Sequence, residues 1–221
     1  MKNVCQGIKL RELLMKLKTI TLIASILISC NDNNDPPPDD QPYRGLIPAA
    51  IGNYWIYTDS TWINQNLTSV KLDTVEIVDI IMRDSITWWQ LFGWEIPYFR
   101  REFAIINDSV YSWQIHWTSF KSLVYIPPPD TMVVYESTIS GDNLIYITAE
   151  LWNEPIEIGL GTFDGCGRYI VGEEEDERIE EFIAPGVGII LVDWVHDSTW
   201  SWPYDYQRKM VLVDYDVSNG D

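Results

Sequence analysis

The sequence predicts an all-β protein, built as a single strongly curved antiparallel meander that forms an open barrel or half-barrel. Short segments rich in Val, Ile, Thr, Tyr and Trp recur from residue 46 onward, and turn-forming residues separate them. No stretch in this region keeps an apolar spacing of about 3.6 residues over three turns, which argues against helices. About twelve strands exceed what a flat open sheet usually holds, so the sheet should curl or, in the alternative interpretation, fold over as a sandwich.

The expected strands follow one another along the chain with short links, which favours antiparallel hairpins. Their ranges are 53–59, 70–82, 86–94, 97–106, 109–117, 119–126, 131–138, 143–152, 162–171, 177–184, 188–196 and 206–216. Turn residues support the breaks at 107–108, 127–130 and 140–143. In the turn at 185–188, Pro185 sets its own φ and Gly186 can supply a positive φ.

The first 29 residues have the pattern of a secretory signal. Lys16 and Lys18 precede an apolar run over residues 20–28, which ends at Ser29 and Cys30. This run is too short for the ~20 apolar residues of a membrane-spanning helix. Met15 begins a well-proportioned signal by itself, so the true start of translation is either Met1 or Met15. An N-terminal core helix is the alternative.

The segment Leu27–Cys30 resembles the bacterial lipobox, in which the cysteine becomes the lipidated first residue of the mature protein. An ordinary signal peptide is the alternative. Residues 30–45 then form an acidic, proline-rich tether with little apolar surface to bury. Acidic residues behind such a cysteine resemble the surface-export signal of Bacteroidota lipoproteins, although a solvated linker would look the same. We therefore expect a lipid-anchored protein of the bacterial outer membrane that faces the periplasm or the surface.

One β domain is expected over residues 46–216, because no linker interrupts its strands, and residues 217–221 form a short tail. The full chain has a net charge of −18. Without residues 1–29, which hold five basic residues and one acidic residue, 10 basic and 32 acidic residues remain and the net charge is −22. Such a surface repels phosphate backbones and anionic headgroups, so we expect no nucleic-acid partner and membrane contact only through the lipid.

No motif singles out a catalytic, metal or cofactor site. Cys166 lacks a recognisable histidine partner and is expected to be a small buried residue. Glycoside hydrolysis would need two facing carboxylates, and the spacing selects no pair among the many acidic residues, of which we considered Glu150, Asp193, Asp197 and Asp205. The consecutive acids at 173–177 lack the alternate spacing of a calcium loop and suggest a solvated hairpin tip.

The chain has 11 tryptophans, most of which we expect in the core. Trp200 and Trp202 are the exception, because they lie in a turn-like segment and, two residues apart, point to one side. Pro203 restricts Trp202 to an extended backbone. Together with Trp113 and Trp117, which share one face of a predicted strand, these residues are the candidate binding surface. The alternative is that Trp200 and Trp202 plug one end of the barrel.

Three motifs resemble those of uncharacterised lipoproteins of the Bacteroidota and allied phyla. Residues 52–57, GNYWIY, match a GxxWxY opening, and residues 161–166 with 183–190 match a GTFxxC … APGVGxV close. Some relatives resemble the half-barrels of periplasmic lipoprotein carriers, in which helices fill the concave face, but this sequence shows no obvious helix. The resemblance implies no activity and supplies no catalytic residue. Repeated Asp-Ser and Asp-Thr pairs also resemble an O-glycosylation acceptor, although turn chemistry is the favoured explanation, since most of them lie at predicted turns or strand starts.

Two classes of function follow from these observations. The first is a non-enzymatic cell-envelope lipoprotein that binds an apolar, glycan or protein partner through an aromatic face. The second is a glycan-directed hydrolase that uses an unidentified carboxylate pair. The first is favoured, because no spacing in the sequence selects a nucleophile, an acid or a metal site.

Overall fold

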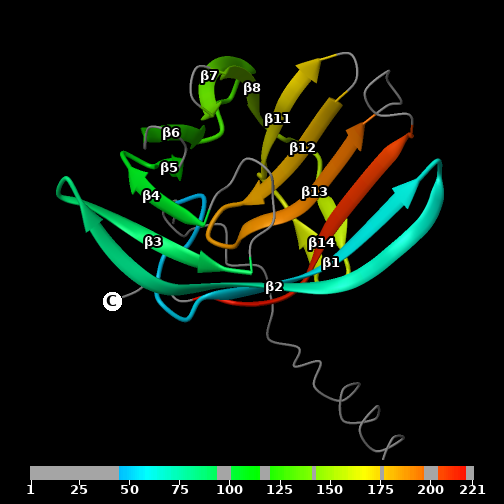
Figure 1. The fold of residues 1–221 in the computed structure, drawn as a ribbon, viewed down its shortest axis with the longest axis horizontal. Helices are drawn as coiled ribbons and strands as arrows, with labels where there is room; N and C mark the ends of the chain where they lie inside the picture. Colours follow the sequence, from blue (N-terminus) through cyan, green and yellow to red (C-terminus); the bar gives the residue numbers. More distant parts are fainter. Residues whose placement is uncertain are drawn as a thin grey trace, which may run out of the picture. The chain divides into compact units, whose positions relative to one another are not determined.

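The computed structural model describes residues 45–93, 101–114, 120–140, 143–174, 177–196 and 204–217. All of them belong to one compact unit that spans residues 40–221. The described residues contain no helix, and therefore none that could span a membrane. Figure 1 shows the strands, whose bounds are β1 Tyr54–Ile63, β2 Asn66–Arg83, β3 Ile86–Phe92, β4 Glu102–Ile106, β5 Ser109–Gln114, β6 Phe120–Tyr125, β7 Val133–Ser140, β8 Asn143–Leu151, β9 Ile156–Ile158, β10 Gly161–Phe163, β11 Gly167–Glu174, β12 Glu177–Ala184, β13 Gly188–His196 and β14 Tyr206–Asp216.

Twelve of these strands form one antiparallel sheet in the order β6-β5-β4-β3-β2-β1-β14-β13-β12-β11-β8-β7. Neighbours in the sheet are consecutive in the chain, apart from the separate β9–β10 hairpin between β8 and β11 and the pairing of β1 with β14. The sheet curls until its two edges, β6 and β7, approach each other, and one seam between them has no backbone ladder. The predicted all-β open barrel is therefore confirmed, and the sandwich alternative is wrong because a single sheet encloses the core.

Apart from shifts of a few residues at strand ends and the unpredicted β9, the strands differ from the prediction at two places. The first strand continues to Ile63, and a turn at Asn64 and Gln65, both with positive φ, leads into β2 at Asn66. The predicted strand 162–171 is two elements, because the chain turns at 164–166 between β10 and β11. The predicted residues 94–100 and 115–119 lie outside the described part of the chain.

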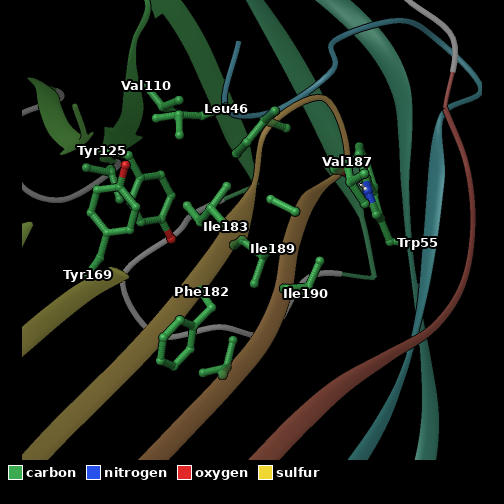
Figure 2. Close-up of a cluster of buried hydrophobic side chains, with 14 of the residues drawn as sticks. Leu46, Trp55, Val110, Tyr125, Tyr169, Phe182, Ile183, Val187, Ile189 and Ile190 are labelled. Carbon is green, nitrogen blue, oxygen red and sulfur yellow. Dashed lines mark hydrogen bonds between the residues drawn. The ribbon is translucent and has the colours of Figure 1, made fainter. Parts of the chain in front are cut away.

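Alternate residues of the strands fill the interior. Trp55 and Tyr57 of β1 are buried, and so are Val75 and Ile77 of the neighbouring β2. Leu46, in the segment before β1, also belongs to this core, as Figure 2 shows. The remaining apolar space beside these residues is about 10 Å³, room for about one water molecule, so side chains rather than a ligand-sized cavity occupy this part of the interior.

The opening and closing sequence motifs meet inside the barrel. Trp55 Nε1 donates a hydrogen bond of 2.6 Å to the carbonyl of Val187, and the hydroxyl of Tyr57 donates one of 2.9 Å to the carbonyl of Ile189. Figure 2 shows Trp55 beside Val187. At Gly188, φ is 106° and a Cβ atom would lie 3.2 Å from Trp55 Nε1, which explains a glycine there.

The turn that carries Val187 has the predicted chemistry. The amide of Val187 donates to the carbonyl of Ala184 at 3.1 Å, which closes a four-residue turn around Pro185 and Gly186. Gly186 has a φ of 74°, as expected for the third position of a type II turn. The turn is thus rigid and presents its Val187 carbonyl to Trp55.

Replacement of Trp55 by Phe should destabilise the domain by about 1–3 kcal/mol, because it leaves the buried carbonyl of Val187 without a donor. The free energy of unfolding, measured by urea titration, checks this. Trp62→Phe is the matched control, since Trp62 is only partly buried at the end of β1. Equal stability of the Trp55→Phe variant and the wild type would contradict the structural role of this hydrogen bond.

Candidate functional site

A pocket of about 190 Å³ lies where the ends of β1, β13 and β14 meet the β1–β2 turn, and we call it the rim pocket. It is lined by Trp62, Gln65, Val195, His196, Asp205, Tyr206 and Gln207. The lining combines aromatic faces with amide, carboxylate and imidazole groups, which can donate and accept hydrogen bonds. These residues come from the first strand, the turn that follows it and the last two strands of the β domain, with Asp205 directly before β14. The β1–β14 ladder, in which Trp62 pairs with Gln207, brings them together.

The β1–β2 turn is attached to the start of β14. The amide of Asn64 donates to the carbonyl of Asp205 at 2.8 Å, and the amide of Asp205 donates to Asn64 Oδ1 at 3.1 Å. Asn64 has a φ of 48°, a conformation that asparagine tolerates better than most residues. This pair of hydrogen bonds fixes the position of Gln65 and Asp205 in the pocket wall.

The aromatic wall is held by neighbouring side chains. Tyr206 packs edge-on against Trp194, with ring centroids 5.3 Å apart and an interplanar angle of 72°. Gln207 Nε2 donates to Asp193 Oδ1 at 3.0 Å, which orients the amide of Gln207. Burial raises the pKa of Tyr206, so its hydroxyl stays protonated at neutral pH. The pocket therefore has pre-positioned polar groups beside fixed rings.

An ion cluster supports the pocket from the interior side of β1 and β14. Arg208 donates to both carboxylate oxygens of Asp59, from Nε at 3.0 Å and from its terminal nitrogen at 2.8 Å. Lys71 Nζ lies 3.4 Å from Asp59 and 2.9 Å from Asp73. Burial opposes ionisation of Asp59, but the hydrogen bonds and charge of Arg208 outweigh it and lower the pKa of the carboxyl. Asp59 is therefore a buried anion that two cations neutralise.

The predicted binding residue Trp113 lies elsewhere, on the sheet face opposite the buried Ser112. Its ring packs edge-on against Trp88, with centroids 5.1 Å apart, and the guanidinium of Arg83 lies 4.9 Å from its centroid. Arg83 also forms a bidentate ion pair with Glu102. The other predicted residues, Trp117, Trp200, Trp202 and the lipidation site Cys30, lie outside the described residues.

Of the acidic residues considered for hydrolysis, Asp197 lies outside the described residues, and Glu150 does not line the rim pocket. Glu150 forms an ion pair of 2.7 Å with Arg168, which also pairs with Glu180. Asp193 accepts the hydrogen bond from Gln207, and Asp205 is the only carboxylate among the described residues that line the rim pocket. Within the part of the chain that the structure describes, no group of three or more His, Cys, Asp or Glu side chains could hold a metal ion.

Cys166 is fully buried and lies in the β10–β11 connection rather than on a strand. Its thiol approaches the carbonyl of Phe163 at 3.7 Å, and its own carbonyl accepts from the amide of Trp152 at 2.8 Å. Burial, with a smaller contribution from Asp164, raises the pKa of the thiol to about 12. Such a thiol is not a nucleophile at neutral pH, which agrees with the predicted packing role.

No family model matches the chain, and no curated protein sequence matches it. Among solved structures, the chain is similar to the crystal structure of a "putative lipoprotein" from Parabacteroides distasonis, with a TM-score of 0.41 and 12% sequence identity. The similarity covers 80% of this chain and 100% of that chain. Similarity at this level assigns neither a family nor a function to this chain.

Replacement of Arg208 by Gln should reduce the free energy of unfolding by about 3 kcal/mol, because it leaves Asp59 buried with Lys71 as its remaining cation. Chemical denaturation at pH 7 measures the loss. In the wild type, the Asp59 carboxyl has a lower pKa in the folded state than in the unfolded state. Its contribution to stability is therefore complete above the unfolded-state pKa and is lost as the pH falls through the folded-state pKa.

Arg178→Gln is the control for this change. Its side chain is 50% exposed and pairs with Glu180, so the loss should stay within ~1 kcal/mol. If both variants lose the same stability, burial does not distinguish the two ion pairs and the interpretation of Asp59 is wrong.

Proposed function

We propose that this chain is a non-enzymatic, lipid-anchored protein of the bacterial cell envelope that binds a carbohydrate in its rim pocket. The observation that supports the ligand class is the composition of the pocket wall. Trp62 offers aromatic surface for the C–H face of a sugar ring, and Gln207, its partner in the β1–β14 ladder, offers with Gln65 and Asp205 hydrogen-bond partners for the hydroxyl groups.

The size of the pocket favours a small ligand. Its volume of about 190 Å³ is below the ~300–1,000 Å³ typical of pockets for drug-sized molecules. One sugar ring, either free or at the end of a longer glycan, fits this description better than an acyl chain or a protein segment. The apolar space beside Trp55 is about 10 Å³, which is too small for an acyl chain.

The cellular location rests on the N-terminal sequence. Leu27–Cys30 supplies the proposed lipidation site, and the acidic tether that follows separates the lipid from the β domain. With a net charge of −22 after signal removal, the chain has no electrostatic attraction to anionic headgroups. We therefore assign membrane contact to the lipid, in the outer membrane, with the rim pocket left to a soluble or surface-bound glycan.

Replacement of Cys30 by Ala should abolish incorporation of radiolabelled palmitate into the protein expressed in its bacterial host. The thioether-linked lipid needs the Cys30 thiol, so the variant should also leave the membrane fraction. Cys5→Ala is the control and should label normally. Labelling that persists in Cys30→Ala, or a mature protein that retains residues 15–29, would contradict the proposed anchor.

Replacement of Trp62 by Ala should weaken carbohydrate binding at least tenfold, since loss of ring stacking removes about 1.4 kcal/mol or more. The detergent-solubilised full chain is screened on a glycan array, and the strongest ligand is then titrated by calorimetry against each variant. Trp113→Ala, in β5 and outside the residues that line the rim pocket, should bind like the wild type.

Two further outcomes decide between the candidate surfaces. Loss of binding in Trp113→Ala with normal binding in Trp62→Ala would move the site to the face predicted from the strand pattern. Trp200→Ala with Trp202→Ala tests the other sequence prediction, because residues 197–203 join His196 to the β14 side of the pocket in the chain. Loss of binding without loss of stability in this double variant would support a role for these rings in the ligand site.

A further inference from the structure

The β6–β7 seam is held by side chains instead of a backbone ladder. Ser122 and Ser137 have their Oγ atoms 2.9 Å apart, and each hydroxyl also approaches a carbonyl of the opposite strand, Thr138 for Ser122 and Leu123 for Ser137. Tyr135 of β7 donates to the carbonyl of Val124 in β6 at 2.6 Å. Since every other junction of the curled sheet is a backbone ladder, this seam is its weakest junction in the described residues.

Behind the seam lies a buried carboxyl group. Glu181 of β12 is only 2% exposed, and the hydroxyl of Tyr125, the last residue of β6, donates to its Oε2 at 2.6 Å. Its Oε1 is fully buried and has no hydrogen-bond partner among the described residues. The carboxyl therefore has one of its two oxygens satisfied, by a residue of the seam.

The titratable side chains that face Glu181 are phenols. They are Tyr57 of β1, Tyr125 of β6, Tyr135 of β7 and Tyr169 of β11, whereas the neighbour in β13, Val192, is apolar. Figure 2 shows Tyr125 and Tyr169 together, with ring centroids 5.0 Å apart. Burial raises the pKa of Tyr57, Tyr125 and Tyr135, so none of these three carries a charge at neutral pH.

The surroundings favour the neutral form of Glu181 while the seam is closed. Burial raises the pKa of the carboxyl to about 7, although the hydrogen bond from Tyr125 opposes this shift. An ionised carboxylate at this place needs hydration. Water can reach it most easily through the seam, because only the side-chain contacts of Ser122, Ser137 and Tyr135 must break there. Ionisation of Glu181 and opening of the seam are therefore thermodynamically linked.

We propose that the β6–β7 seam is a pH-sensitive opening of the barrel, in which ionisation of Glu181 shifts the population from a closed to an open seam. In the open form, water reaches the carboxylate and the facing edges of β6 and β7 lose their side-chain contacts. The carboxyl has its ordinary pKa near 4.5 in the open form and a pKa of about 7 in the closed form. The open population consequently rises with pH between these two values and is constant above the upper one.

Hydrogen–deuterium exchange of the full chain, corrected for the intrinsic pH dependence of exchange, tests this. In peptides that cover 120–125 and 133–138, protection should fall up to about tenfold per pH unit between pH 5 and 7 and then level off. Glu181→Gln should make this protection independent of pH. Glu180→Gln is the matched control, because the neighbouring Glu180 pairs with Arg168 and Arg178 and should leave the dependence intact.

Tyr125→Phe provides a second, directional readout. Removal of the hydroxyl that stabilises the carboxylate raises the closed-form pKa further, so protection should continue to fall to a higher pH before it levels off. Persistence of the wild-type pH dependence in Glu181→Gln would overturn the proposal. The same conclusion would follow if peptides of the β1–β14 ladder lost protection in parallel with the seam, since that result indicates global unfolding.

Discussion

The hydrogen bond from Trp55 to the carbonyl of Val187 connects the first strand of the domain to the hairpin between β12 and β13, across the neighbouring β14. The curved sheet brings β1 close to the β12–β13 hairpin, and this arrangement is stable only if a side chain fills the space between them. Trp55 fills it, Tyr57 adds a second hydrogen bond to Ile189, and Gly188 leaves the indole the space that a Cβ atom would restrict. The contact also accounts physically for the pairing of an early and a late sequence motif, since each motif supplies one partner.

Two buried carboxyl groups in the same barrel have opposite environments. Asp59 faces Arg208 and Lys71, and its pKa is lowered, so it is a permanent anion within a neutralised cluster. Glu181 faces phenols, and its pKa is raised, so its charge depends on pH near neutrality. The first group is fixed in an ion cluster of β1, β2 and β14, whereas the second lies beside the weakest junction of the sheet. The carboxyl group with a fixed charge and the carboxyl group with a pH-dependent charge therefore lie in different parts of the same sheet.

Local pattern was sufficient to predict most strands, because alternation of apolar residues and turn chemistry are properties of neighbouring residues. The pattern did not predict the turn at Asn64 and Gln65, because Gln65 has a positive φ, which is uncommon for glutamine. It also missed the β9–β10 hairpin, whose strands of three residues are too short to show a period. The rim pocket was not predictable, because Trp62 meets Gln207 through the ladder between the first and last strands, and no local signal encodes that pairing.

The place of the seam determines the order in which the barrel can be completed. A meander whose ends remained free would form entirely from local hairpins, but here Tyr57 pairs with Leu212 near the other end of the chain. Contacts of such large sequence separation carry a high entropic cost and form slowly, whereas hairpins such as β2–β3 need only their own turn. The half of the sheet from β1 to β6 and the half from β7 to β14 can each assemble locally, and the β1–β14 ladder unites them. Until that ladder forms, β1 and β14 are edge strands open to association with other chains, so its formation removes two of the four strand edges of the separate halves and leaves only β6 and β7.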